Sequence, residues 1–269
     1  MLPRQLLGAL LALVALATVA CRGGSDTTRF GALQLPGSNE GGVYLALGDS
    51  IAAGSGASDG AATSYVALVA QALRQHYGDT LELVSLARGG EATQDLIDQQ
   101  LPAATERLRQ GDVRVVTVTI SGNDLNQVQY SPDAAVCIGD PRNAACPVGD
   151  ILVGVEQRLD RILRELHAAG PAATIVIQVY PNLFSGTGNP LEHAADIAFD
   201  MLDDVIASVA GRNGVLVADP RGDFAGRGGT LTHLLDPTPD PHPNDAGYRL
   251  IAEAFLKALG SSTADGGTD

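Results

Sequence analysis

The stretch Tyr44-Leu45-Ala46-Leu47-Gly48-Asp49-Ser50-Ile51 is an apolar run that stops abruptly at a glycine, an acid and a serine. An apolar run of this length is typical of a buried strand, and the residues that end it are typical of a turn. The sequence therefore predicts that a core strand delivers Ser50 to a turn. A serine in this place can also serve only as a helix cap, and that interpretation stays open.

The same pattern recurs along the chain. Apolar, β-branched runs alternate with stretches in which apolar residues are three and four positions apart, which is a repeated βα pattern. Near-continuous apolar strands joined by helices predict a parallel sheet covered on both faces, a three-layer αβα sandwich. The expected strands are residues 43–47, 81–86, 113–120, 174–180 and 215–218. The expected helices are residues 64–76, 93–109, 148–169, 190–212 and 244–259.

Two of these helices carry start signals. Asn189 followed by Pro190 is expected to cap the fourth helix, and Asn244 or Asp245 is expected to cap the last one. With 269 residues and 45% hydrophobic content, the chain can build one sizeable core. The sequence predicts a single α/β domain over residues 41–260.

Residues of chemical interest follow the predicted strands. Gly90 comes after the second strand, Ser121-Gly122-Asn123-Asp124 after the third, and Asp240-Pro241-His242-Pro243-Asn244 enters the last helix. Ligands of open α/β sheets bind beyond the carboxyl ends of the strands, so we expect these segments to converge there with Ser50. A serine hydroxyl becomes a nucleophile only when a base takes its proton, and His242, held between two prolines, is the best candidate of five histidines.

In this order the four blocks resemble the GDSL-like, SGNH-hydrolase family of serine esterases, over about residues 43–259. The resemblance implies a five-stranded sheet of flavodoxin-like order 2-1-3-4-5. It also implies hydrolysis of carboxylic esters through an acyl-enzyme, with no metal or other cofactor. Ser50 would be the nucleophile and His242 the base and then the acid. The oxyanion hole would consist of the backbone N–H groups of Ser50 and Gly90 and the side-chain amide of Asn123.

The third member of the triad departs from the family pattern. An Asp is expected three residues before the histidine, but that position is Pro239. Asp240 lies two residues before His242 and Asp236 lies six before it, so either carboxylate can orient the imidazole, with Asp240 preferred. A backbone carbonyl near Pro239 is the alternative and would leave a Ser-His dyad. Asp49 is expected to brace the turn by accepting backbone hydrogen bonds.

Charge and composition restrict the partners. The formal net charge is -14 with no basic run, which argues against nucleic acid and against an anionic membrane surface. Aromatic residues make up 4% and there is no Trp, so a stacked sugar platform has little support and a small or aliphatic acyl group fits better. The loops at 125–147 and 181–189, the second containing Phe184, are expected to form the substrate groove. The ester itself can belong to a small molecule, a lipid or an acylated saccharide.

The N-terminus predicts export. Residues 1–20 carry one cation, Arg4, and an apolar stretch too short to span a bilayer, which is typical of a signal peptide. Cys21 follows Thr18-Val19-Ala20, which resembles a bacterial lipobox without its usual Leu. We expect Cys21 to be lipidated and residues 21–40 to be a flexible linker, so that the only membrane contact is the lipid anchor. Ordinary cleavage would instead release the protein. Residues 261–269 are expected to be a disordered tail.

Export also decides how the remaining cysteines are interpreted. In an oxidising compartment Cys137 and Cys146, separated by a short loop, are expected to form a disulfide, with two free thiols as the alternative.

Three other functions compete with the esterase. A nucleotide-binding protein is disfavoured because Gly54-Ser55-Gly56 lacks the third glycine at the required offset and no phosphate-loop motif exists. A surface-tethered binding protein on the same fold, without activity, and an acyltransferase both remain open.

Overall fold

The computed structural model of the chain describes residues 33, 35 and 41–260. The predicted signal peptide, the lipidation site Cys21 and the predicted tail lie outside the described residues. The predicted linker also lies outside them, apart from residues 33 and 35. Of these two, Leu35 is buried against the core.

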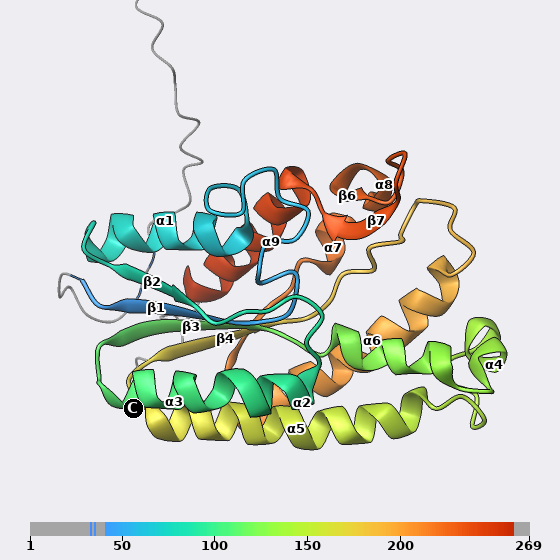
Figure 1. Ribbon diagram of the computed structural model, residues 1–269, viewed down its shortest axis with the longest axis horizontal. Helices are drawn as coiled ribbons and strands as arrows, with labels where there is room; N and C mark the ends of the chain where they lie inside the picture. The colour runs from blue at the N-terminus through green and yellow to red at the C-terminus, as the bar shows by residue number, and fades with distance from the viewer. Residues whose placement is uncertain (1–32, 34, 36–40, 261–269) are drawn as a thin grey trace, which may run out of the picture.

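A five-stranded sheet forms the centre of the molecule (Figure 1). All neighbouring strands pair in parallel, in the order β2-β1-β3-β4-β5. The strands are β1 (Val43–Gly48), β2 (Glu82–Ser85), β3 (Val113–Thr119), β4 (Thr174–Gln178) and β5 (Leu216–Ala218). The predicted fold class and strand order are therefore confirmed. Strands β1 and β3 are buried along almost their whole length, as expected for a sheet covered on both faces.

Helices cover both faces of the sheet. Helices α1 and α9 lie together on one face, and α3, α5 and α6 pack together on the other (Figure 1). Their bounds are α1 (Tyr65–Tyr77), α3 (Leu101–Arg109), α5 (Val148–Ala169), α6 (Glu192–Arg212) and α9 (Asp245–Gly260). Within the described ranges, no helix is both long enough and apolar enough to cross a membrane.

Several shorter elements complete the fold. They are α2 (Thr93–Asp95), the π-helix η1 (Leu96–Gln100), the 3₁₀-helix η2 (Gly122–Tyr130), α4 (Ala134–Gly139), α7 (Arg221–Phe224), α8 (Gly228–Leu231) and the antiparallel pair β6 (Thr232–His233) and β7 (Asp240–Pro243). Two of them, α2 and η1, lie within the helix predicted over residues 93–109, and the others were not predicted. Most of these shorter elements lie toward the end of the molecule at which the sheet strands finish (Figure 1).

The predicted cap of the fourth long helix is wrong. Helix α6 begins at Glu192, and the side-chain oxygen of Asn189 accepts a hydrogen bond from the N–H of Leu191. This local bond forms an Asx-turn, which competes with helix initiation at Pro190. The other cap is as predicted, because the Asn244 side-chain oxygen accepts from the N–H groups of Ala246 and Gly247 at 3.0 and 3.1 Å.

The helix predicted over residues 93–109 is divided by a wide turn. In η1 the N–H of Leu101 donates to the carbonyl of Leu96, five residues back. Pro102 follows directly, and a proline inside a regular helix lacks an N–H and clashes with the carbonyl four residues earlier. The wider turn accommodates that ring, so the proline explains where the α-helical pattern is interrupted.

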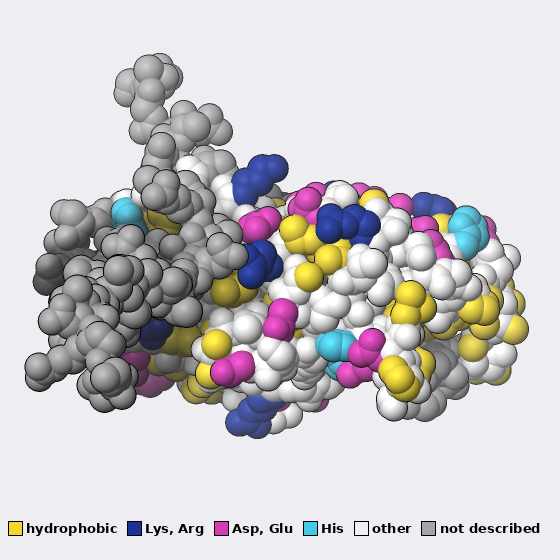
Figure 2. All heavy atoms as spheres, turned by 90° about the horizontal axis from the view of Figure 1, so that it is seen from above, with side chains coloured by type: hydrophobic (Ala, Val, Ile, Leu, Met, Phe, Trp, Pro, Cys, Tyr) yellow, Lys and Arg dark blue, Asp and Glu magenta, His cyan; other side chains and the backbone are white. Residues whose placement is uncertain are grey.

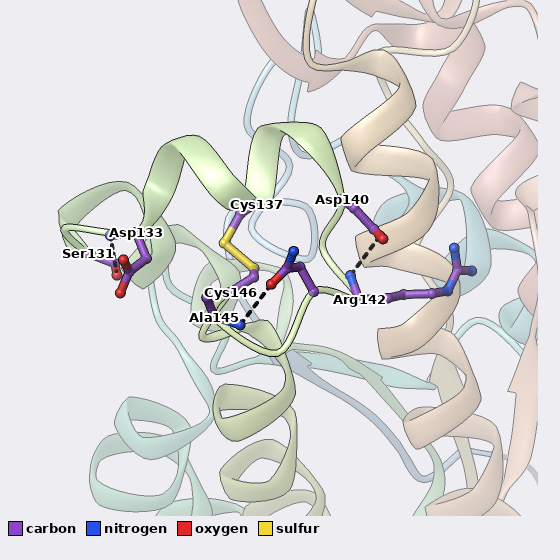
Figure 3. The surroundings of a disulfide bond; sticks show 8 residues. Ser131, Asp133, Cys137, Asp140, Arg142, Ala145 and Cys146 are labelled. Atoms are coloured by element: carbon purple, nitrogen blue, oxygen red, sulfur yellow. Dashed lines mark hydrogen bonds between the residues drawn. A yellow bond between two sulfur atoms is a disulfide. The ribbon is translucent and has the colours of Figure 1, made fainter.

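A disulfide closes the loop that follows α4. The sulfur atoms of Cys137 and Cys146 lie 2.07 Å apart, so α4 is tied to the residues that precede α5 (Figure 3). Within the loop, the side-chain oxygens of Asp140 and Asn143 each accept a hydrogen bond from an N–H two residues ahead, at 2.9 Å. The loop is therefore a series of short turns held at both ends.

Candidate active site

The turn after β1 presents Ser50. Gly48 adopts φ +141°, and a Cβ on it would lie 2.1 Å from the Thr119 carbonyl oxygen, so only glycine fits at this close approach. Ser50 is half-buried, and its carbonyl accepts from the N–H of Ser55 at 2.9 Å. Within the described part of the chain, the Ser50 hydroxyl has no hydrogen-bond partner, so it is available for chemistry.

Asp49 braces this turn from inside, as expected. Its Oδ1 accepts from the N–H of Ile51 at 2.9 Å, and its Oδ2 accepts from the hydroxyl of Tyr180 at 2.5 Å. Tyr180 reaches Asp49 by passing over Gly122, where a Cβ would lie 2.8 Å from the tyrosine ring. Burial raises the pKa of Asp49 to about 6, although the bonds from Tyr180 and Ile51 act in the opposite direction.

This raised pKa predicts a pH dependence of stability. The ordinary pKa of an Asp carboxyl is 3.8, so the unfolded chain loses this proton at a lower pH than the folded protein does. The free energy of unfolding should fall as pH rises from about 4 to about 6, and Asp49→Asn should remove about 2–3 kcal/mol of that fall. Asparagine can still accept from the Ile51 N–H through its oxygen, and its NH₂ group can donate to the Tyr180 oxygen in place of the bond that Asp49 accepts. Urea unfolding of both proteins across this range measures the effect, and equal slopes would contradict it.

The imidazole of His242 is held by Asp240. The Nδ1 of His242 lies 2.5 Å from the Asp240 Oδ1, which also accepts from the His242 N–H at 2.9 Å. Burial opposes the charged carboxylate, but the hydrogen bonds from His242 hold the pKa of Asp240 below its ordinary value. Among the described residues, the Nε2 of His242 has no hydrogen-bond partner. The imidazole thus has one nitrogen fixed and the other free.

Asp236 belongs to a different histidine. Its Oδ2 lies 2.6 Å from the Nδ1 of His233, and the Nε2 of His233 lies 2.8 Å from the carbonyl oxygen of Gly56. The geometry thus brings Asp240, and not Asp236, to His242. A second His–Asp pair next to the first was not anticipated from the sequence.

The segment that follows the nucleophile turn packs against His242. A Cβ on Gly56 would lie 2.9 Å from the His242 Cβ and 2.7 Å from the Pro243 carbonyl oxygen. The same segment is bonded to the start of α9, since the Asp245 carboxylate accepts from the N–H of Ser58 at 2.8 Å and from the hydroxyl of Thr63 at 2.8 Å. These contacts fix the His242 strand relative to the turn that carries Ser50.

The segment that contains Gly90 connects the nucleophile turn with Asn123. A Cβ on Gly89 would be 3.9 Å from the Ser50 Cβ, and a Cβ on Gly90, whose φ is +82°, would meet no atom within 4 Å. The side-chain amide of Asn123 donates to the Glu91 carbonyl at 3.0 Å. The segment of residues 89–91 thus approaches Ser50 at Gly89 and is bonded to Asn123 at Glu91, with open space beside Gly90.

The backbone before Asn123 is strained. Ser121 has φ +107°, a region that costs a residue with a side chain on the order of 1–3 kcal/mol, and it is fully buried. Asp124 is buried and accepts hydrogen bonds from Thr93 and Arg158. These buried bonds fasten the start of η2 to α2 and α5, so the strained turn is well supported.

An apolar groove begins next to Asn123. It has a volume of ≈ 510 Å³ and runs from the start of η2 between α4 and the first turns of α6. Its walls include Leu125, Val128, Ile138, Phe184, Leu191 and Phe199. Both loops that were expected to form the substrate groove contribute to it. Figure 2 shows hydrophobic side chains gathered at this end of the molecule.

The comparison with protein families decides the assignment. The model of the GDSL-like Lipase/Acylhydrolase family matches residues 46–250, which covers the nucleophile turn, both glycines, Asn123 and His242. The chain belongs to this family. The resemblance stated from the sequence is thereby confirmed, and the GDSL-like protein is an ester hydrolase of the lipase and esterase class.

Solved structures share its fold. An extracellular lipase from Streptomyces rimosus is 24% identical, with 82% of this chain and 100% of that chain covered and a TM-score of 0.60. A phospholipase A1 from Streptomyces albidoflavus is 25% identical, with 82% and 99% covered and a TM-score of 0.60. An acetylxylan esterase from Geobacillus stearothermophilus is 21% identical, with 83% and 96% covered and a TM-score of 0.55. No curated protein matched the chain.

Sequence reasoning missed several supporting residues of this GDSL-like hydrolase. Tyr180 was placed only at the end of a predicted strand, and His233 was given no role. Gln100 was hidden within a helical pattern, although the side-chain amide bonds the backbone of Gly48. Pro102 was the available signal, because a proline within a helix predicts an irregular turn close to it.

Proposed function

We propose that the protein is an exported serine esterase that acts through a Ser50–His242–Asp240 triad. The Nε2 of His242 takes the proton of the Ser50 hydroxyl while the Ser50 oxygen attacks the ester carbonyl carbon. The tetrahedral intermediate expels the alcohol, which receives the proton from His242. Water then attacks the acyl-enzyme with His242 again as base, and the carboxylic acid leaves Ser50 free.

The observation that carries this proposal is the Asp240–His242 pair. An imidazole whose Nδ1–H is held by a carboxylate has its Nε2 in the acceptor state, and the Nδ1–Oδ1 distance here is 2.5 Å. A carboxylate in this position also stabilises the imidazolium that forms when the serine proton moves. The pair lies on the segment that packs against the loop following Ser50.

Negative charge on the carbonyl oxygen would be stabilised by three donors. They are the N–H groups of Ser50 and Gly90 and the side-chain amide of Asn123, as the family resemblance implies. Donors already fixed in place supply the largest electrostatic contribution to acyl transfer. The Asn126 amide donates to the side-chain oxygen of Asn123 at 3.0 Å and so supports the orientation of that side chain.

The apolar groove would hold the acyl chain. It begins at the residue before Asn123, and two of its wall residues, Ile138 and Leu191, are 53% and 42% exposed. Each methylene buried on binding is worth about 0.8 kcal/mol, so kcat/KM should rise from acetyl toward octanoyl esters.

A groove-filling substitution tests this assignment. Ala198 lines the groove on α6, so Ala198→Phe should lower kcat/KM for p-nitrophenyl octanoate about 10- to 100-fold while the value for the acetate stays unchanged. Ala207→Phe, an exposed position on the same helix, is the matched control. Equal losses for both esters, or none, would show that the acyl chain binds elsewhere.

Export and lipidation at Cys21 form the second part of the proposal. The Cys137–Cys146 disulfide supports export, because such bonds persist in oxidising compartments, and the Streptomyces rimosus protein is an extracellular lipase. In a bacterial host the full chain should fractionate with membranes, and Cys21→Ala should move it to the soluble fraction. Soluble wild-type protein would instead favour ordinary cleavage after Ala20 and a released enzyme.

Two alternatives have distinct outcomes. An inactive binding protein would not react at Ser50 with a serine-directed phosphonate. An acyltransferase would pass the acyl group to an added alcohol in preference to water, which product analysis reveals.

A further inference from the structure

We infer that Gln100 is a positioning residue that fixes the spacing of the three oxyanion donors. Its side chain lies behind the site and touches neither the groove nor the space beside Gly90. The inference rests on the proposed function, because it concerns the oxyanion hole of the same site.

The side chain of Gln100 is buried and fully bonded. It is 1% exposed, its Oε1 accepts from the N–H of Gly48 at 2.9 Å, and its Nε2 donates to the Gly48 carbonyl at 2.8 Å. The same Nε2 donates to the Glu91 carboxylate at 2.5 Å. Gly48 lies two residues before Ser50, and Glu91 follows Gly90. One amide thus joins the two segments that supply the backbone donors.

The Gln100 amide lies where the regular pairing between β1 and β2 ends. The regular pairing of β2 with β1 ends at Ser85 and Ala46, and beyond it the N–H groups of Leu86 and Arg88 still donate to the carbonyls of Ala46 and Gly48 at 2.8 and 2.9 Å. No backbone carbonyl of this segment accepts from the Gly48 N–H, which is bonded to the Gln100 side chain. The Gly48 N–H would be left without a strand partner, and an unpaired buried N–H costs about 1–3 kcal/mol. The Gln100 side-chain oxygen supplies the acceptor that a strand carbonyl would offer to the Gly48 N–H, and its amide nitrogen is a second donor to the Gly48 carbonyl, beside the Arg88 N–H.

Glu91 extends the connection to the third donor. Its carboxylate accepts from Gln100, while its own carbonyl accepts from the side-chain amide of Asn123 at 3.0 Å. The Glu91 side chain is 7% exposed, and its nearest cation, Arg88, lies 3.9 Å away. Through these hydrogen bonds, Gln100 and Glu91 connect the backbone segments that carry the Ser50 and Gly90 N–H groups with the Asn123 side chain.

Gln100 is the last residue of the π-helix η1. Pro102 forces the wide turn of η1, and π-turns inside helices occur frequently at functional sites. Gln99, the preceding residue, is exposed and bonds Arg88 outside the core, so the two adjacent glutamines face different surroundings. Of these two adjacent glutamines, only Gln100 is buried and bonded to the backbone near Ser50, whereas Gln99 makes a surface contact.

The direct test replaces Gln100 by an apolar residue of similar length. Gln100→Met should lower kcat for p-nitrophenyl esters about 10²-fold and leave KM unchanged, because misplacing donors affects the transition state while the groove is formed by other elements. Asn123→Ala should give a loss of similar size. Gln110→Met, an exposed glutamine at the end of α3, should leave both parameters unchanged.

An exchange of charge tests the link to Glu91. Gln100→Glu places a second carboxylate against Glu91 and should lower kcat further. Adding Glu91→Gln restores an amide–carboxylate contact in the reverse direction, so the double variant should recover part of the lost kcat. A residue needed only for stability would change the melting temperature without this recovery in the folded enzyme.

The outcomes distinguish failure of the proposed esterase function from failure of the positioning role of Gln100. If Ser50→Ala keeps its turnover, the proposed function fails, whatever Gln100 does. If Ser50→Ala is inactive while folded Gln100→Met keeps the wild-type kcat, only the positioning role is overturned. If Gln100→Met does not fold, the exchange variants decide, and a double variant no better than Gln100→Glu overturns the inference.

Discussion

Replacing Ser50 or His242 by alanine is expected to lower kcat for p-nitrophenyl butyrate by about 10⁴- to 10⁶-fold. Without Ser50 no acyl-enzyme can form, and without His242 nothing takes the serine proton. The two losses should be nearly equal, and the double variant should be no worse than either single one, because both residues serve one step. The oxyanion donors would leave a small residual rate above that of water.

His167→Ala is a suitable control for this pair, since His167 is exposed near the end of α5. Initial rates of nitrophenol release give kcat for each folded variant. If either Ser50→Ala or His242→Ala stays within about tenfold of the wild type, the assigned residue is not part of the reaction.

The second large loss of kcat is expected when the Asp240 carboxylate is replaced. Asp240→Asn should lower kcat about 10⁴-fold while KM changes little. An asparagine can donate its amide to Nδ1, which favours the tautomer with the proton on Nε2, where it cannot accept the serine proton. The effect should appear as a slower step of chemistry and not as weaker binding.

Asp236→Asn provides the matched comparison. Asp236 is four residues earlier and pairs with His233, which contacts the Gly56 carbonyl and not His242. Its replacement should cost far less activity than that of Asp240. A larger loss for Asp236→Asn would mean that the wrong histidine has been assigned as the base.

The long elements of the fold follow from local pattern, and the strand order does not. Apolar runs such as residues 43–47 and 113–120 predict buried strands, and the helix expected over residues 148–169 matches α5. The order 2-1-3-4-5 came from the family resemblance. The start of α6 was mispredicted, because whether Asn189 caps a helix or closes an Asx-turn depends on the chain around it.

The candidate site was predictable where a residue has its own chemistry. Ser50, Gly90, Asn123 and His242 follow strands or fixed loops, and the structure gathers their segments at one edge. The choice between Asp240 and Asp236 was open, because spacing along the chain does not say which carboxylate meets which imidazole. Gln100 left no signal of its own, since a buried glutamine in a helix looks like any surface glutamine in sequence.

The most direct test of the central claim is reaction with a p-nitrophenyl alkylphosphonate, followed by mass spectrometry of the digested protein. The account predicts one phosphonate per chain, attached to the peptide that contains Ser50, at a rate that falls sharply in His242→Ala. Labelling at another residue, or no labelling of a folded protein that still hydrolyses esters, would contradict it.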